Sequence, residues 1–368
     1  MTASAASGAT SITQPTTEQV STESITTVPV TAVPVTTGPV APVSATSVSV
    51  TSVSVSSISA TSVVDPASVA ARPSTGCGTD TAGAGENLIT ETDLARAGRV
   101  LDILPSAYDR VTPLPLVLDL HGYQEPLEIQ RLMSNLAAAG EQHGFVVVIP
   151  QADDEVPRWD ASVGSTDVKF IGQVIDLELT KHCIDEARVY VDGLSNGAFM
   201  SSAVACGLGD RVAAVAAVAG IRDPKGCTFS RPVPVIAFHG TADTFVSYEG
   251  GLGPSVANLP TGGGGTLGAS AVTTDGPSVE QIAAAWAGRN GCVHAPPTST
   301  VVANDVTLLA FDCPADAPVE LYRIEGGGHA WPGSEFSRSI ESIVGITTFS
   351  IDATALMWAF FAAHPLIG

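Results

Sequence analysis

Short apolar runs alternate with amphipathic segments along most of the chain beyond residue 100. The runs are rich in Val, Leu, Ile and Ala, which is typical of strands buried on both faces of a sheet. We expect such strands at Val100–Leu104, Leu114–Leu120, Phe145–Ile149, Arg188–Val191, Val212–Ala219, Pro234–Phe238 and Glu320–Ile324. Pro150 is expected to end the third of them, because proline cannot donate to a strand ladder.

Between these runs, apolar residues recur mostly at helical spacing. We expect helices at Pro126–Gly140, Asp167–His182, Ser195–Leu208, Ser278–Arg289 and Ile351–Ala363. The glycine-rich stretch Gly250–Thr274 predicts a surface loop. Strands that alternate with helices indicate an α/β fold with a mostly parallel central sheet and helices on both faces. Reactive groups are then expected just past the carboxyl ends of the strands.

Residues 1–73 differ from the rest of the chain, because Ser, Thr, Val, Ala and Pro make up nearly all of them and no aromatic residue is present. Their charged residues are Glu18, Glu23, Asp65 and Arg72, so the acidity belongs to the remainder. Such a segment cannot bury much apolar area, and we expect a disordered tail or linker, open to O-glycosylation. The alternative is a short array of aggregation-prone strands. The folded domain is expected at 74–368.

The chain has 368 residues and a formal net charge of −21, with only three lysines. Such a surface repels nucleic acid and anionic membranes, so neither is expected as a partner. It is compatible with a neutral ester substrate. The apolar stretch Val212–Ile221 is too short to span a bilayer. No basic start and apolar core follow Met1, so we expect that a secreted form has lost its leader. We also expect a monomer.

Six cysteines are spread along the chain, and no two form a C-x-x-C pair. A zinc ribbon or thioredoxin-type site is therefore not expected. An even number of widely spaced cysteines favours three disulfides and an oxidising compartment, although six cysteines allow fifteen pairings. Local separation favours Cys206–Cys227 and Cys292–Cys313, which leaves Cys77–Cys183. The alternative is a set of buried free thiols in a cytosolic enzyme.

One motif predicts a nucleophile. The strand before Gly193 is followed by Gly193-Leu194-Ser195-Asn196-Gly197, which is the order G-x-S-x-G, and then by a predicted helix. In a nucleophile elbow the strained serine projects from the sheet, and the next backbone N–H lies at a helix N-terminus, where it can donate to an oxyanion. Ser195 is the predicted nucleophile and the Asn196 N–H one predicted oxyanion donor. The alternative is an ordinary Gly/Ser turn.

A serine nucleophile needs a base and an acid that orients the base, and in the α/β-hydrolase order these follow as Ser, Asp or Glu, and His. Asp243 follows the predicted strand Pro234–Phe238, and His329 follows Glu320–Ile324. We therefore expect Asp243 as the acid and His329 as the base. His239 is expected to be structural, and His121 to sit in a loop where backbone N–H groups matter more than its ring. The remaining histidines, expected on solvated helix faces or loops, are His143, His182, His294 and His364.

The loop His121-Gly122-Tyr123 follows an early core strand, where the second oxyanion donor is expected. We expect the Tyr123 N–H to be this donor, and Tyr123 to contact substrate. Trp159 and Trp331 lie on loops that should reach the site and predict an aromatic wall for an acyl or aryl group. For Trp159, packing beneath a loop is the alternative. No metal or organic cofactor is needed for this chemistry.

The chain resembles the secreted polyhydroxybutyrate-depolymerase-like and feruloyl-esterase-like group of α/β-hydrolases, from about Cys77 to the C-terminus. The motifs that carry the resemblance are, in order, Leu120–Tyr123, Pro150 with Trp159, Ile184-Asp185 with Arg188–Tyr190, Gly193–Met200, Val218–Gly220, His239–Asp243, Trp286 with Asn290–Cys292, and Gly326–Gly333. The resemblance implies the α/β-hydrolase fold, extracellular ester hydrolysis, the triad Ser195–Asp243–His329 and disulfides at Cys206–Cys227 and Cys292–Cys313. Asp192 departs from the group, which usually has a small hydroxyl or neutral residue there. The Gly250–Thr274 stretch is also longer than usual.

The sequence thus favours a secreted serine esterase without a cofactor. A polyester such as polyhydroxyalkanoate, or an aryl polyester, is the first expected substrate, and a feruloyl or acetyl ester on plant polysaccharide is the second. A protein of another class, a surface binding protein that uses a hydrolase scaffold on a Ser/Thr-rich stalk, is the remaining alternative.

Overall fold

The computed structural model describes residues 65–91, 93–152, 154–228 and 230–367. Ten strands form one sheet in the order β1-β2-β4-β3-β5-β6-β7-β12-β11-β10. The strands are β1 (Gly85–Glu91), β2 (Gly98–Leu104), β3 (Leu114–Leu120), β4 (Val146–Ala152), β5 (Ile184–Gly193), β6 (Ala214–Val218), β7 (Val235–Gly240), β10 (Thr298–Ala303), β11 (Val306–Ala310) and β12 (Val319–Ile324). The six strands from β4 to β12 in the middle of this order run parallel, as the alternation of strands and helices predicts.

Antiparallel strands extend the sheet at both ends, where β1 and β2 flank one side and β11 and β10 the other. Neither β1 nor β10 was expected from the sequence, nor was β11. The outermost strands β1 and β10 are largely exposed, so they lack the continuous apolar runs that mark the central strands. Polar edge strands of this kind carry a weak sequence signal.

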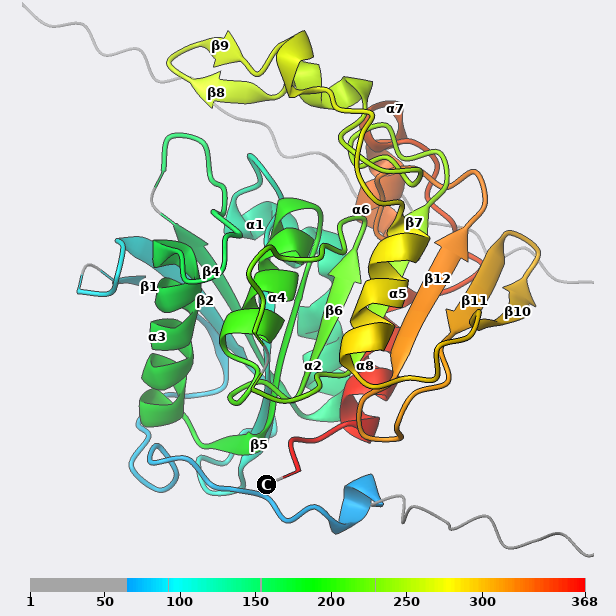
Figure 1. The fold of residues 1–368 in the computed structure, drawn as a ribbon. Coiled ribbons are helices and arrows are strands. Elements are labelled where there is room, and N and C mark those ends of the chain that lie inside the picture. The colour runs from blue at the N-terminus through cyan, green and yellow to red at the C-terminus, as the bar shows by residue number, and fades with distance from the viewer. Residues whose placement is uncertain (1–64, 92, 153, 229, 368) are drawn as a thin grey trace, which may run out of the picture. The chain divides into compact units, whose positions relative to one another are not determined.

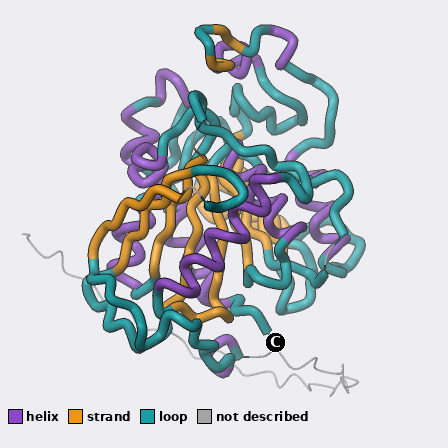
Figure 2. Tube along the Cα trace, turned by 90° about the vertical axis from the view of Figure 1, so that its left-hand side faces the viewer, coloured by secondary structure: helices purple, strands orange, loops and turns teal. Residues whose placement is uncertain are grey.

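Helices cover both faces of the sheet (Figure 1), and Figure 2 shows the strands gathered between them. One apolar core lies beneath α3, α4 and α5, and the other beneath α1, α2 and α8. The helices are α1 (Leu127–Ser134), α2 (Leu136–His143), α3 (Thr166–Lys181), α4 (Asn196–Gly207), α5 (Val279–Arg289), α6 (Glu335–Ser339), α7 (Glu341–Val344) and α8 (Ala353–Ala363). None of the helices in the described part of the chain is long and apolar enough to cross a membrane.

Two sequence predictions about elements were wrong in detail. The helix expected at Pro126–Gly140 is two helices, because Asn135 adopts the left-handed conformation with φ 53° between α1 and α2. Strand β4 continues through Pro150, where it was expected to stop. Beyond Val148, β4 pairs with β2 but no longer with β3, so Pro150 removes no donor from a ladder on that side.

Three disulfides join Cys77 to Cys183, Cys206 to Cys227 and Cys292 to Cys313, the pairing that local separation favoured. Residues 1–64 of the predicted tail lie outside the described residues. Closer to the domain, the Arg72 N–H donates to Asp185 Oδ1 at 2.8 Å and Pro73 forms a bridge with Asp185. Contacts with the sheet therefore start shortly before residue 74.

The Gly250–Thr274 stretch contains more structure than a plain loop. It holds the short 3₁₀ helices η2 (Pro254–Asn258) and η3 (Ala269–Ala271), and the hairpin of β8 (Pro260–Gly262) and β9 (Gly265–Thr266). The hairpin projects beyond the carboxyl ends of the parallel strands (Figures 1 and 2). It therefore lies on the side of the sheet where the predicted site residues are found.

Candidate active site

Ser195 occupies the sharp turn between β5 and α4. Its backbone has φ 57° and ψ −116°, a conformation that costs a non-glycine residue strain and is associated with functional sites. A Cβ on Gly197 would lie 1.9 Å from the Leu120 carbonyl oxygen, and one on Gly193 would lie 2.5 Å from Gly197. The two glycines of the motif are thus needed because the turn presses backbone against backbone. The strained serine is half-buried, so its side chain keeps some access to solvent.

Asp243 and His329 form a hydrogen-bonded pair. Asp243 follows β7, and its Oδ2 accepts a hydrogen bond from His329 Nδ1 at 2.7 Å. Its other oxygen accepts the N–H groups of Phe245 and Val246 at 2.8 and 2.9 Å, which holds the carboxylate in place. The backbone of His329 is in turn held by the Val344 carbonyl oxygen at 2.6 Å. This is the acid–base arrangement that orients an imidazole for proton transfer through Nε2.

The charges of this pair are mutually stabilised. Burial raises the pKa of the Asp243 carboxyl, but the charge and hydrogen bond of His329, with His239 beside it, outweigh burial and hold the pKa below its usual range. Burial lowers the pKa of the His329 imidazole, but Asp243 and the nearby Glu125 raise it above its usual value. The charge of Asp243 therefore favours protonation of the His329 imidazole.

Ser195, Asp243 and His329 all follow strand ends at one edge of the sheet. Leu194 bridges Val218, Val218 pairs with Phe238, and Phe238 pairs with Tyr322, so β5, β6, β7 and β12 end at a common level. Among the described residues, however, the Ser195 hydroxyl makes no hydrogen bond to the His329 ring. The structure joins the acid to the base and places the serine at the same edge. Catalytic hydrogen bonds are often long before substrate binds.

Two backbone N–H groups of the predicted oxyanion site make no hydrogen bond to another backbone group within the described part of the chain. They belong to Tyr123, in the loop after β3, and to Asn196, the first residue of α4. The Asn196 amide side chain is fixed by the Trp159 backbone, since its Oδ1 accepts the Trp159 N–H at 2.7 Å and its Nδ2 donates to the Trp159 carbonyl at 3.1 Å. Both predicted oxyanion donors are therefore backbone N–H groups without a backbone acceptor, and such groups can stabilise an oxyanion.

The two tryptophans do not form the expected aromatic wall. Trp331 is 1% exposed and packs in the core beneath α8, where its indole N–H donates to Thr354. Trp159 is 4% exposed, and its indole N–H donates to the His121 carbonyl oxygen at 3.0 Å. Both rings are buried and hydrogen-bonded to groups inside the protein, so they stabilise their loops and do not line the site. For Trp159, the alternative of packing beneath a loop holds.

Tyr123 connects the oxyanion loop to the hairpin above it. Its hydroxyl donates to the Pro260 carbonyl oxygen at 2.7 Å. The Gly263 N–H of the same hairpin donates to Glu155 at 2.9 Å. The Gly250–Thr274 segment is therefore hydrogen-bonded to the loops on which Tyr123 and Trp159 lie.

Glu125 is a carboxyl group that the motif search does not single out. Its Oε2 accepts the Gly122 N–H at 2.9 Å, within the loop that carries Tyr123. Burial raises the pKa of Glu125 to about 7, although the hydrogen bond from Gly122 and the charge of His329 oppose this shift. Its only signal in the sequence is its position three residues after Gly122.

Two further buried carboxyl groups lie side by side on the strands that lead to the elbow. Asp119 on β3 and Asp192 on β5 are in register, and neither side chain is exposed. Ser134 and Gln130 of α1 donate to Asp119. Burial raises the pKa of both carboxyls, and the neighbouring Asp119 raises that of Asp192 further. Burial and the Asp119 charge therefore favour the neutral form of the Asp192 carboxyl.

The other histidines differ in their surroundings. Burial lowers the pKa of His121 to about 4, so it stays neutral. His239 Nε2 lies 2.9 Å from the Val246 carbonyl oxygen, a structural contact as expected. The prediction of a solvated His182 was wrong, because its side chain is completely buried among carboxylates. Helix periodicity alone did not reveal those partners, which come from distant segments.

Comparison with known proteins relates the chain to ester hydrolases. Feruloyl esterase B of Piromyces equi is 29% identical over 242 residues, which are 63% of this chain and 42% of that protein. Poly(3-hydroxyalkanoate) depolymerase C of Paucimonas lemoignei is 35% identical over 125 residues, which are 32% of this chain and 30% of that protein. The alignments cover less than half of these curated relatives. No protein-family model matches.

Among solved structures, an acetyl xylan esterase from Aspergillus awamori superimposes with a TM-score of 0.51 at 16% identity. The match covers 70% of this chain and 98% of that protein. At this identity the likeness establishes the fold, which is that of the α/β-hydrolases, as expected from the sequence.

Proposed function

We propose that this protein, an α/β-hydrolase in fold and similar in sequence to esterases, is a secreted serine esterase that hydrolyses carboxylic esters. The strained Ser195, at the same sheet edge as the hydrogen-bonded Asp243–His329 pair, is the strongest support for this function. Three disulfides support an oxidising, extracellular location.

In the proposed mechanism Ser195 Oγ attacks the ester carbonyl carbon while His329 Nε2 accepts its proton. Asp243 keeps the ring oriented and stabilises the imidazolium. The Tyr123 and Asn196 N–H groups donate to the oxyanion, and each such donor typically contributes about 3 kcal/mol to transition-state stabilisation. His329 then protonates the leaving alcohol, and an acyl group remains on Ser195. Water, deprotonated by His329, releases the acid and restores the serine.

For the substrate we propose a polyester, with a polyhydroxyalkanoate or an aryl polyester as the first candidate. The similarity to the Paucimonas lemoignei depolymerase favours it. The β8–β9 hairpin is hydrogen-bonded to Tyr123 and Glu155, so it would add contact surface for a chain-like substrate above the proposed oxyanion loop.

An acyl ester on plant polysaccharide is the second candidate. Feruloyl esterase B, with the longer of the two sequence alignments, and the acetyl xylan esterase structure favour it. Turnover of polyhydroxybutyrate film, methyl ferulate and acetylated xylan by the same preparation separates the two classes. The polymer class is supported if the film is degraded and the other two substrates are not.

The catalytic proposal is tested with Ser195→Ala. We expect turnover of a short p-nitrophenyl ester to fall by at least about a thousandfold, because the nucleophile is lost. A fluorophosphonate probe should label the wild type and not the variant. Ser339→Ala, at an exposed serine of α6, serves as the control and should keep full turnover and labelling. No turnover above the spontaneous rate in either wild type or Ser195→Ala, with no labelling of either, would instead support the non-catalytic binding protein.

A further inference from the structure

A second cluster of ionisable groups lies at the other end of β5, away from Ser195. Asp102 of β2, Glu178 near the end of α3, and His182, which follows α3, each place a ligand-type atom within 4.8 Å of the others. Asp102, Glu178 and His182 have no exposed side-chain surface. Because β5 begins just after His182 and ends two residues before Ser195, this cluster is separate from the proposed catalytic site.

The spacing of the cluster suits a bound cation. His182 Nε2 lies 3.3 Å from Asp102 Oδ2 and 3.5 Å from Glu178 Oε2. Nitrogen and oxygen ligands about 2.1 Å from a tetrahedral zinc ion are about 3.4 Å from one another. Two of the three separations are thus close to those that a small metal ion imposes, and the third pair of ligand atoms lies within 4.8 Å.

Several oxygens in the cluster have no donor. Within the described residues, both carboxylate oxygens of Glu178 and Oδ1 of Asp102 are buried without a hydrogen-bond partner. Buried polar atoms are rarely left unpaired, because their desolvation is not compensated. These oxygens lie around the His182 ring, where they are available to coordinate a cation.

The charges indicate a divalent ion. Asp80, Asp102 and Glu178 are carboxylates, and the Lys181 ammonium contacts Asp102 Oδ2. When all three carboxyls are ionised and the imidazole is neutral, as metal binding requires, these groups carry two net negative charges, which one divalent cation would neutralise. Without a metal, the neighbouring carboxylates raise the pKa of the His182 imidazole and favour its protonation. The competing occupant is the proton, since burial and the adjacent Asp102 raise the pKa of Glu178 to about 8.

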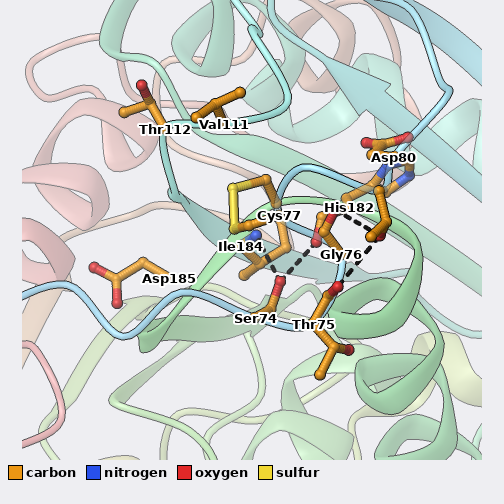
Figure 3. The surroundings of a disulfide bond; sticks show 12 residues. Ser74, Thr75, Gly76, Cys77, Asp80, Val111, Thr112, His182, Ile184 and Asp185 are labelled. Carbon is orange, nitrogen blue, oxygen red and sulfur yellow. Dashed lines mark hydrogen bonds and ion pairs between the residues drawn. A yellow bond between two sulfur atoms is a disulfide. The ribbon is translucent and has the colours of Figure 1, made fainter.

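The second nitrogen of His182 is held as in many metal sites. Its Nδ1 lies 2.9 Å from Asp80 Oδ2, and the Tyr108 hydroxyl donates to the same carboxylate oxygen. A carboxylate on the far nitrogen orients a metal-bound imidazole and increases its basicity. Figure 3 shows Asp80 beside His182, close to the Cys77–Cys183 disulfide. Gly76 packs so tightly here that a Cβ would lie 2.2 Å from the His182 carbonyl oxygen.

We propose that Asp102, Glu178 and His182 bind one structural divalent transition-metal ion of the zinc type, with Asp80 positioning the imidazole. One imidazole and two carboxylates suit zinc better than calcium or magnesium, which prefer oxygen ligands alone. The ion would fasten the end of α3 to β2, close to the disulfide that anchors the start of the domain. It takes no part in the proposed ester hydrolysis.

Zinc content and stability test this site. Wild-type protein is stripped with a chelator, incubated with Zn²⁺ at pH 8, desalted and analysed by mass spectrometry for metal. We expect about one retained zinc per chain and a rise of a few degrees in Tm on zinc addition. Glu178→Gln keeps the shape and should lose both effects. Asp176→Asn, at an exposed position of the same helix, is the matched control and should keep them.

Esterase turnover of Glu178→Gln shows whether the variant is folded, and we expect it to equal the wild type, because the cluster lies at the opposite end of β5 from Ser195. The proposal is wrong if wild type and Glu178→Gln retain the same amount of zinc, or if zinc leaves the wild-type Tm unchanged. Protonation alone would then neutralise the cluster. This result would not affect the proposed ester hydrolysis, which is tested separately with Ser195→Ala.

Discussion

Buried carboxyl groups surround the strand ends that carry Ser195. Asp243 is held ionised by His329, whereas burial moves the pKa of Glu125 to about 7 and raises that of Asp192. Hydrogen-bond donors and neighbouring charges decide which of these groups is charged. The environment of each carboxyl therefore matters more than its residue type.

Glu125 is expected to influence the pH profile through His329. Because the Glu125 charge raises the pKa of the His329 imidazole, Glu125→Gln should lower that pKa. The base is then neutral at lower pH, so the acidic limb of kcat/KM should move to lower pH. Profiles of p-nitrophenyl ester hydrolysis measure this shift. Glu128→Gln, at an exposed carboxylate of α1, should leave the limb in place. An unmoved limb in Glu125→Gln would contradict the coupling.

Asp192 is expected to make stability depend on pH. Its folded pKa is raised above that of the unfolded chain, so its contribution is complete below about pH 4 and is lost as pH rises toward the folded pKa. In Asp192→Asn the amide N–H can donate to Asp119 at any pH, whereas the aspartic acid must first be protonated. The variant should therefore raise Tm by a few degrees at pH 8 and leave it unchanged near pH 4.

Thermal unfolding at the two pH values measures the Asp192 effect. Asp275→Asn, at an exposed aspartate, should match the wild type at both. A Tm gain for Asp192→Asn that is as large at pH 4 as at pH 8 would show that packing, rather than protonation, causes it.

At the scale of elements, the turn from β5 to α4 and the β8–β9 hairpin are held differently. Gly197 lies against the end of β3 with no room for a Cβ, so the elbow is rigid. The hairpin is attached by few contacts, among them the hydrogen bonds of Tyr123 and Glu155. Segments with few buried contacts open locally more often than the core.

Tyr123→Phe should loosen the hairpin. It removes the hydrogen bond to Pro260 but keeps the backbone N–H of the proposed oxyanion site. A typical hydrogen bond contributes about 1 kcal/mol, so the open population should rise about fivefold. Limited proteolysis within Gly250–Thr274 should accelerate by this factor, with global Tm and hydrolysis of a small ester unchanged. An unchanged cleavage rate would show that other contacts hold the segment.

At the scale of the whole molecule, the disulfides differ in what they constrain. Cys77–Cys183 closes a loop with a sequence separation of 106, whereas Cys206–Cys227 spans 21. In the chain-entropy model these contribute about 5 and about 3 kcal/mol. The long loop ties the first ordered residues of the domain to the start of β5.

Removal of the long-range disulfide should therefore cost more stability. The double variant Cys77→Ala/Cys183→Ala should lower the free energy of unfolding by about 1–2 kcal/mol more than Cys206→Ala/Cys227→Ala. Equilibrium urea denaturation measures both against the oxidised wild type. A larger loss for the local pair would mean that native contacts at Cys206 and Cys227, rather than loop entropy, dominate.

Local patterns in the sequence were sufficient for the central strands, most helices and the strand–serine–helix turn. Each of these depends on residues close together in the chain, such as the glycines that flank Ser195. The sequence also predicted that Ser195, Asp243 and His329 lie at the same edge of the sheet, because the ends of parallel strands meet there. The edge strands β1 and β10 were not predicted from the sequence, because their exposed positions show no apolar periodicity.

The sequence by itself therefore determined the fold class, the elbow and the identity of the candidate acid and base. Only the tertiary structure decided that Trp331 is a core residue, that Asp119 shares its environment with Asp192, and that His182 lies among carboxylates. The physical reason is that burial and charge depend on which distant segments pack together. Periodicity reports a residue's own element, and not the groups that another element brings to it.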